Sequence, residues 1–178
     1  MIRPATPGDD VAVGELLVRA FESAYALKMP EVEITEQRRA ELRAVAHKRA
    51  RATVLVLERE GQLLGTVALF RPGAEGTQAW LPNAADLRHL ATAPEVHGQK
   101  LSSALLDAAE RLAWSWGVEA ICLHVRRGAL GVSALYRRRG YLREAAADLD
   151  LPSVYLEALV LHRGSERSTP SSNSAAGF

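Results

Sequence analysis

The segment from Asp86 to Trp116 constrains the fold more than any other part of the sequence. Residues 86–92 are typical of a strand, residues 93–98 contain Pro and Gly and predict a tight turn, and residues 99–116 predict an amphipathic helix. One face of this helix carries apolar side chains at helical spacing, namely Leu101, Ala104, Leu105, Ala108 and Leu112. The pattern indicates a strand that leads directly into the N-terminus of a helix, as in an α/β domain.

The first turn of such a helix is suited to binding an anion. Its backbone N–H groups have no partner within the helix, and they lie at the positive end of the helix dipole, which favours a phosphate group above all. Gly98 allows the backbone to bend and to approach a ligand closely, and Ser102 and Ser103 add hydroxyl donors. The alternative interpretation is an ordinary junction between a strand and a helix.

Composition limits the size and the class of the protein. The 178 residues, of which 48% are hydrophobic, can bury one substantial core but leave no room for two ordinary domains. The 22 Lys and Arg residues nearly balance the 21 Asp and Glu residues, which excludes a global attraction to nucleic acid or anionic lipid. The single cysteine, Cys122, excludes an internal disulfide and a cysteine-based metal cluster, and its apolar neighbours indicate a buried thiol.

The sequence also predicts the location of the protein in the cell. No apolar run approaches the roughly 20 residues that span a membrane, and the N-terminus lacks the apolar core of a signal peptide. We therefore expect a cytoplasmic protein without nucleic-acid or membrane partners.

The rest of the chain predicts one domain, residues 1–162, followed by a flexible tail, residues 163–178, in which Ser, Gly and Pro dominate. The expected elements are strand 2–5, a helix with Thr6 as its N-cap, a charged helix 35–50, an antiparallel hairpin of strands 53–57 and 63–70, strand 86–92, helix 99–116, a parallel strand 120–125, helix 132–139, and strands 141–143 and 155–161.

Two motifs resemble those of the Gcn5-related N-acetyltransferase (GNAT) superfamily. Residues 92–106 are similar to the pyrophosphate-binding segment, in which an apolar strand and a Pro precede Arg/Gln-x-x-Gly-x-Gly/Ala at the start of a helix. His97 stands where the family prefers Arg or Gln, Lys100 replaces the central glycine, and Ser102 replaces the closing Gly or Ala. Residues 134–141 resemble the helix-ending motif Leu-Tyr-x-x-x-Gly-Phe/Tyr, at the expected distance downstream.

The resemblance covers roughly residues 2–161 and implies both fold and activity. The implied fold is a single α/β (α+β) domain with a mixed, mostly antiparallel central sheet, a splayed pair of parallel strands, and helices on both faces. The implied activity is transfer of an acetyl group from acetyl-CoA, the acyl donor, to a primary amine of a small molecule or peptide, with no metal. Whether two copies form a homodimer is left open.

The resemblance also assigns roles to residues. The main chain of Leu90, Ala91 and Thr92 would bind the pantetheine arm of CoA. The segment that would face the pyrophosphate comprises His97, Gly98, Gln99, Lys100, Leu101, Ser102 and Ser103. Tyr136 matches a tyrosine that often protonates the departing thiolate, since a phenol with a pKa near 10 remains a donor at neutral pH. The alternative for Tyr136 is a core aromatic residue at a helix end.

The general base is a weaker prediction. Asp86 lies where many resembling sequences have a strand carboxylate, which would take a proton from the amine through water; the alternative is an ion pair with Arg88. His89 and His124 could share a face near the cleft, although lone strand histidines more often have structural roles. The spacing of the five histidines indicates no metal site.

Other charged residues have two interpretations each. Glu31 and Glu33 would attract a cationic acceptor or would simply be solvated. The arginines in residues 126–127 and 137–139 would hold the 3′-phosphoadenosine end of CoA or would form a basic surface. Ala129 replaces an Asn that contacts the cofactor arm in many members, so this contact is expected to be missing.

Two other functions compete with acetyl transfer. The altered glycine positions are compatible with a catalytically silent GNAT-like domain that binds CoA or a protein partner as a sensor. A nucleotide-binding domain without acyl chemistry is disfavoured, because neither Gly-x-Gly-x-x-Gly nor Gly-x-x-x-x-Gly-Lys-Ser/Thr occurs. Since Lys100 falls in the predicted first helical turn, its φ is expected to be negative.

Overall fold

The computed structural model describes residues 1–164, so the predicted tail lies outside the described residues except for Arg163 and Gly164. The chain forms one sheet with the strand order β1-β2-β3-β4-β5-β8-β6, and a short β7 pairs with β8. The strands are β1 (Ile2–Pro4), β2 (Ala52–Arg59), β3 (Gln62–Phe70), β4 (Ala84–Thr92), β5 (Ala120–Arg126), β6 (Leu142–Arg143), β7 (Leu149–Leu151) and β8 (Val154–His162). Among the strands of residues 1–164, only β4 and β5 pair in parallel.

The predicted hairpin is confirmed. β2 and β3 pair antiparallel, and the turn between them consists of Glu60 and Gly61, which both have positive φ, at 52° and 76°. Two consecutive residues with positive φ are typical of the type I′ turn, whose twist matches that of the paired strands.

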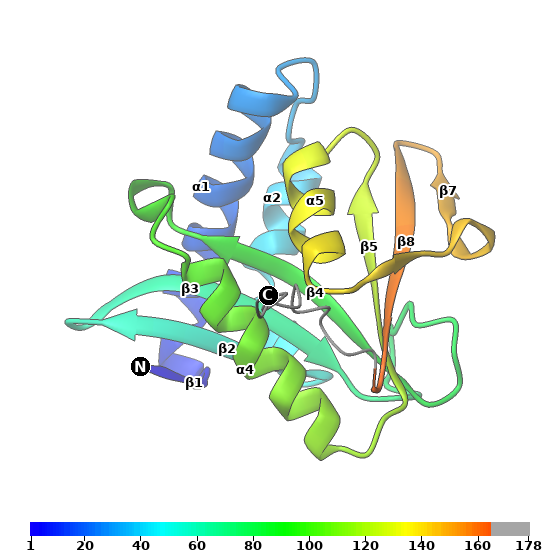
Figure 1. Ribbon diagram of the computed structural model, residues 1–178. Helices are drawn as coiled ribbons and strands as arrows, with labels where there is room; N and C mark the ends of the chain where they lie inside the picture. Colours follow the sequence, from blue (N-terminus) through cyan, green and yellow to red (C-terminus); the bar gives the residue numbers. More distant parts are fainter. Residues whose placement is uncertain (165–178) are drawn as a thin grey trace, which may run out of the picture.

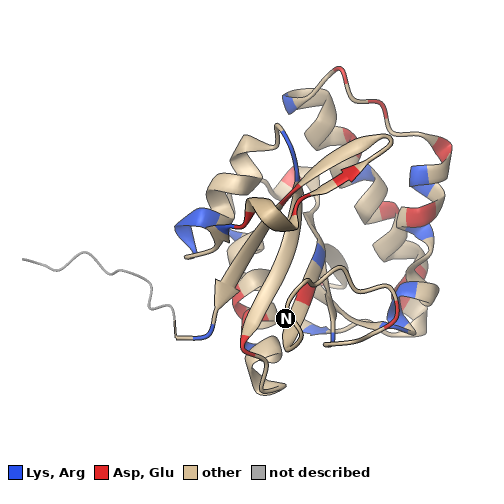
Figure 2. Cartoon of the chain, turned by 90° about the vertical axis from the view of Figure 1, so that its right-hand side faces the viewer, with Lys and Arg blue, Asp and Glu red and all other residues tan. Residues whose placement is uncertain are grey.

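Helices cover both faces of the sheet (Figure 1). The helices on one face are α1 (Asp10–Lys28), α2 (Glu36–Arg43) and α3 (Val45–Arg49), which pack against β2 and β3. The opposite face carries α4 (Leu101–Ser115) and the end of α5 (Leu130–Arg138). Basic and acidic residues are interspersed along the helices (Figure 2).

The start of the first helical region follows its prediction. Thr6 and Asp9 form a capping box, and Pro7 opens a 3-10 turn that continues into α1.

The second helix departs from its prediction, because the expected helix 35–50 is interrupted at Ala44, where ψ is 52°. Leu42 and Val45, on either side of the break, are fully buried. The local sequence contains no Gly or Pro that would have predicted the interruption.

The parallel strands separate, as predicted. β4 and β5 are paired only from Ala84 and Ala120 to Leu87 and Leu123, although both strands continue beyond these residues. On its other side, β4 has an irregularity where His89 and Leu90 lie opposite a single residue of β3, and His89 has a φ of 55°. A bulge of this kind bends the strand and redirects its backbone. The two strands therefore diverge beyond the middle of the sheet.

The C-terminal part contains elements that were not predicted. β7 is a three-residue strand, and Asp148 just before it accepts hydrogen bonds from Arg143, Tyr155 and the N–H of Ala158.

The predicted buried thiol is confirmed, because Cys122 is fully buried. Among the helices of residues 1–164, none combines the length and apolar character that a membrane span requires.

Candidate functional site

A cavity of about 640 Å³ lies where β4 and β5 diverge. Its walls come from the C-terminal half of α1, the end of β4, the turn before α4, the end of β5, and α5. The residues that line it are Ala20, Phe21, Ala24, Tyr25, Leu27, Lys28, Met29, residues 87–92, residues 96–98, residues 100–103, residues 124–126, Ala129, Gly131, Val132, Leu135, Tyr136 and Arg138.

One end of the cavity is the turn that opens α4. Of the predicted pyrophosphate-binding residues, all except Gln99 line the cavity. The side chain of Gln99 instead accepts a hydrogen bond from Arg59 Nη1 at 3.0 Å. Within residues 1–164 no side chain caps α4, so the orphan N–H groups of its first turn have no side-chain acceptor in this part of the chain.

The prediction of a negative φ at Lys100 is wrong. Lys100 is the N-cap of α4 and has a left-handed backbone, with φ 58° and ψ 20°, so the helix begins at Leu101 and not at Gln99. Gly98 has a φ of 83°, and a Cβ added there would meet no atom within 4 Å, so its conformation and not a lack of space favours glycine. Two left-handed residues turn the chain sharply into the helix.

The middle of the cavity is formed by main chain. Leu90, Ala91 and Thr92 line it, as the resemblance implied. Because the pairing with β5 ends at Leu87, the backbone edge of β4 beyond this residue is not used by β5. This edge can hydrogen-bond an extended ligand that lies between the strands.

Tyr136 stands across the cavity, on α5. Its side chain is buried, and its ring packs edge-to-face against Tyr141 with 5.3 Å between centroids. Burial, and then the negative charge of Glu110, raises the pKa of Tyr136 well above its usual value. The phenol therefore keeps its proton at neutral pH, as a proton donor must.

A buried ion pair fixes α5 against α4. Arg139 Nη2 lies 2.6 Å from Glu110 Oε2 and 2.7 Å from Asp107 Oδ1, and the Arg139 side chain is only 9% exposed. Tyr141 also donates to Glu110, at 3.4 Å. The sequence did not predict that Glu110 is buried, because a single acidic residue in an amphipathic helix is usually expected on its exposed face. The network supports the end of the helix that carries Tyr136.

The predicted arginine cluster is divided between different surroundings. Arg126 and Arg138 line the cavity, and the Arg126 guanidinium lies 5.5 Å from the centre of the Tyr25 ring. Arg127 points to another partner, because it stacks on Tyr155 at 3.4 Å and pairs with Glu157.

Asp86 does not line the cavity. Its carboxylate is 1% exposed, pairs with Arg88 at 2.5 Å, and accepts a hydrogen bond from the backbone N–H of Gln78 at 2.7 Å. The ion pair that was the alternative interpretation is thus present, and a role as base stays a prediction. The exposed Glu31 and Glu33 also lie outside the cavity lining.

The two strand histidines both line the cavity but differ in their partners. His124 Nε2 lies 3.0 Å from the carbonyl oxygen of Ala147, and its ring packs against Trp80. His89 has no hydrogen-bond partner among residues 1–164, and its Nδ1 is buried. The hydrogen bond and ring contact of His124 agree with the structural alternative, whereas a functional role of His89 stays a prediction.

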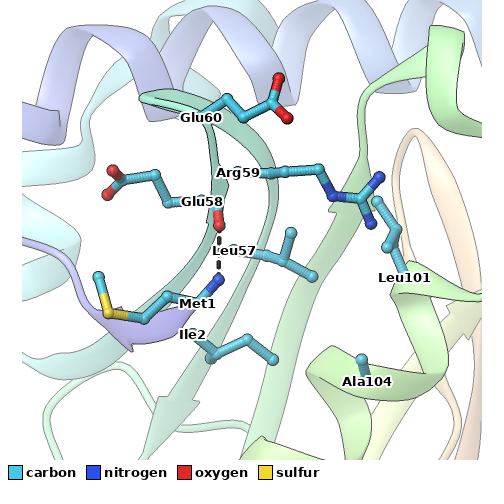
Figure 3. A pocket seen from close by; sticks show the side chains of 8 residues that line it. All are labelled: Met1, Ile2, Leu57, Glu58, Arg59, Glu60, Leu101 and Ala104. Atoms are coloured by element: carbon cyan, nitrogen blue, oxygen red, sulfur yellow. Dashed lines mark hydrogen bonds between the residues drawn. The ribbon is translucent and has the colours of Figure 1, made fainter.

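A second hollow, of about 550 Å³, lies between the N-terminus, the β2–β3 turn and α4 (Figure 3). The N-terminal ammonium of Met1 donates to the carbonyl oxygen of Glu58 at 2.6 Å within it. Among the predicted site residues only Leu101 reaches this hollow, so the first cavity is the candidate site.

No group of three or more His, Cys, Asp or Glu side chains in residues 1–164 is placed to hold a metal ion.

Comparison with known proteins identifies related folds. Residues 12–141 match the family model described as the acetyltransferase (GNAT) family. The structure of the PaiA N-acetyltransferase from Thermoplasma acidophilum in complex with coenzyme A is similar, with a TM-score of 0.65 and 19% identity over 89% of this chain and 96% of that one. A GNAT acetyltransferase from Brucella melitensis in complex with acetyl-CoA has a TM-score of 0.62 and 21% identity over 92% and 88% of the two chains.

A third structure, an acetyltransferase of the GNAT family from Staphylococcus aureus, has a TM-score of 0.71 and 13% identity over 91% of this chain and 98% of that one. Among curated proteins, none matches the sequence. These structural likenesses, all below 25% identity, concern the fold.

Proposed function

The chain belongs to the GNAT acetyltransferase family, and from this premise we propose that it transfers an acetyl group from acetyl-CoA to the primary amine of a small molecule or peptide. The observation that carries the proposal is the cavity between the diverging strands, which has an uncapped helix N-terminus at one end and the protonated phenol of Tyr136 in its wall.

In this proposal the donor lies along β4. The pyrophosphate accepts hydrogen bonds from the first N–H groups of α4, near Gly98 and Lys100, and the pantetheine arm bonds to the backbone edge of residues 90–92. The two similar structures in complex with coenzyme A and with acetyl-CoA support a CoA site in this fold.

The chemistry then requires few side chains. The amine attacks the thioester carbonyl, N–H donors of the β4 edge near the bulge stabilise the oxyanion, and the C–S bond breaks as Tyr136 gives its proton to the departing sulfur. The amine must also lose a proton. Asp86 is the base predicted from the sequence, but Arg88 and the Gln78 N–H already hold its carboxylate, so it would act only through water.

The test is release of free CoA from acetyl-CoA in the presence of a library of amines. Amine-dependent release above the rate of hydrolysis is expected, together with one N-acetylated product per CoA, identified by mass spectrometry. Saturable binding of acetyl-CoA without turnover over the whole library would contradict the enzyme proposal.

That outcome would instead favour the second candidate, a GNAT-like domain that binds CoA or a protein partner as a sensor. The observation in its favour is Lys100, whose side chain and left-handed backbone replace the family's central glycine at the phosphate end of the cavity. Binding and turnover measured on the same preparation separate the two functions.

A further inference from the structure

Acetyl transfer needs a group that takes a proton from the amine, and the lining of the cavity narrows the choice. In residues 1–164 the lining contains no Asp, Glu or Cys. Histidine is the side chain that ordinarily exchanges a proton near neutral pH, and His89, His97 and His124 line the cavity. Because a base must reach the reacting amine directly or through one water, these histidines are favoured over a carboxylate outside the lining.

Two of the three histidines have other surroundings. His97 is exposed and belongs to the turn that opens α4, where the proposed function places the pyrophosphate. His124 Nε2 lies 3.0 Å from the carbonyl oxygen of Ala147, and Trp80 packs against its ring. A carbonyl oxygen only accepts, so His124 carries its proton on Nε2 and keeps a lone pair on Nδ1. His124 is therefore the rival that an experiment must separate from His89.

His89 has no structural partner that accounts for an imidazole. Within residues 1–164 neither of its ring nitrogens has a hydrogen bond or an ion pair. Nδ1 is buried, whereas Nε2 is not and can meet a ligand in the cavity that the residue lines. Buried polar groups are almost always hydrogen-bonded, and an unpaired one lowers stability. The imidazole therefore indicates a function other than packing.

The backbone brings the His89 ring to the gap between the strands. His89 and Leu90 form the bulge of β4, and His89 has a left-handed φ of 55°. Bulges often redirect a side chain beside an active site, and left-handed residues other than glycine cluster at such sites. The bulge lies beyond Leu87, where the pairing of β4 with β5 has ended. In the proposed function the thioester of the donor lies in this gap.

His89 and Tyr136 line the same cavity in opposite protonation states. Burial, and then three positive charges, lower the pKa of His89 well below its usual range, so the imidazole is neutral at pH 7. These charges belong to Lys48, Arg38 and Arg88. Burial raises the pKa of Tyr136 well above its usual value, so the phenol keeps its proton. A pair of groups whose surroundings push their pKa values apart is typical of an acid–base site.

We propose that His89 is the general base of acetyl transfer and takes the proton of the attacking amine on Nε2. This inference rests on the proposed acetyl transfer and names the residue that receives the proton. It replaces Asp86, whose carboxylate is held by Arg88 and by the backbone N–H of Gln78 outside the cavity lining.

The step is balanced. The lone pair of the neutral amine forms the C–N bond, and the electron pair of the carbonyl moves onto its oxygen. The nitrogen then gives its proton to His89, the electron pair returns from the oxygen, and the C–S bond breaks as Tyr136 protonates the sulfur. The imidazolium afterwards loses its proton to water, and the tyrosinate regains one from water. The positive charges near His89 speed this loss but make the imidazole a weaker base.

The experiment replaces His89 with glycine, which adopts a φ of 55° without strain and leaves space for a free imidazole. With the best amine of the library, kcat should fall about 100-fold, the low end of the range for general base catalysis, while the Kd of acetyl-CoA stays within about 2-fold. Imidazole added to the buffer should raise the kcat of His89→Gly at least about 10-fold, in proportion to its concentration, and should leave the wild type unchanged.

Three further variants complete the experiment. His89→Asn also tolerates a left-handed backbone and should lose kcat to the same extent with acetyl-CoA binding intact. His162→Gln removes an exposed histidine at the end of β8 and should retain the wild-type kcat. His124→Asn tests the rival, and imidazole should restore none of the activity that this variant loses.

The outcomes separate the inference from the proposed function. Wild-type kcat in His89→Gly and His89→Asn would overturn the inference and leave acetyl transfer intact. A loss of kcat in His89→Gly that imidazole does not restore would assign His89 a packing role, and rescue of the His124 variant alone would make His124 the base; either result overturns the inference. A wild type that acetylates no amine would overturn the proposed function and this inference with it.

Discussion

At Lys100 a left-handed backbone and a positive charge have opposite effects, and two substitutions separate them. With φ 58° and ψ 20°, Lys100 occupies a region that costs an L-residue about 1–2 kcal/mol. Glycine avoids this strain, but it also gives the unfolded chain more conformational freedom, which lowers the free energy of unfolding by about 0.5–1 kcal/mol. Lys100→Gly should therefore increase the free energy of unfolding by roughly 0.5–1 kcal/mol and the melting temperature by about 1–4 °C.

Lys100→Ala is the matched control, because alanine removes the charge but keeps the Cβ and its strain. Its melting temperature should stay within about 1 °C of the wild type in the absence of ligand. A difference between the Gly and Ala variants, measured by calorimetry at one pH and salt concentration, then reports the backbone alone.

The charge should act on acetyl-CoA. Two unit charges 4 Å apart at an effective dielectric of 20 interact by about 4 kcal/mol, but Lys100 is exposed, and solvent screening and side-chain ordering reduce this to about 1–2 kcal/mol. We expect a wild-type Kd between about 1 µM and 1 mM. Both variants should bind about 5- to 30-fold more weakly at low salt, and the difference should shrink in 0.5 M salt, where the Debye length falls to about 4 Å.

Several results would refute this reasoning. Equal melting temperatures of the Gly and Ala variants would mean that the strain at Lys100 only matches the entropic cost of glycine, about 0.5–1 kcal/mol, and is smaller than argued. Equal Kd values of all three proteins at low salt would place the ammonium away from the phosphates. Failure of the wild type to bind millimolar acetyl-CoA, with binding gained in Lys100→Gly, would show that lysine blocks the loop and would favour the sensor function.

Three other changes test the site and the fold. Tyr136→Phe should lower kcat about 10- to 1,000-fold with little change in acetyl-CoA affinity, and a wild-type kcat in this variant would exclude Tyr136 as the proton donor. Because the pKa of Tyr136 is raised, wild-type turnover should show no loss from phenol ionisation up to about pH 10. Glu110→Gln, which leaves Asp107 on Arg139, should lower the melting temperature by roughly 5–10 °C, or about 2–3 kcal/mol, and an unchanged value would show that the pair does not hold α5. Deleting residues 165–178 should change the melting temperature by less than about 2 °C, and a fall above about 5 °C would show that the segment packs.

The sequence predicted those features whose physical causes are local or repeat along the chain. The hairpin of β2 and β3, the capping box of Thr6 and Asp9 and the strand–turn–helix unit of β4 and α4 each depend on residues close in sequence. The short β7 carried no such signal, because a three-residue strand has too few positions to show alternation.

Pairings across the chain explain what the sequence could not predict about the site. Asp86 and Arg88 lie two residues apart, so their ion pair could be foreseen as an alternative to a catalytic role. Glu110 and Arg139 meet only because α5 folds back onto α4, and no spacing along the sequence brings them together.

The conformation of Lys100 shows how tertiary structure overrides local preference. Lysine is a good helix former and seldom adopts positive φ, so its place before Leu101 favoured a helical backbone. The end of β4 and the axis of α4 are fixed by packing on the sheet, since Ala91, Leu101 and Leu105 are buried. The turn between them must reverse direction within a few residues, and it does so through left-handed conformations at Gly98 and Lys100. The strain at Lys100 is held by the core around it, so a glycine there would relax the loop and leave the core unchanged.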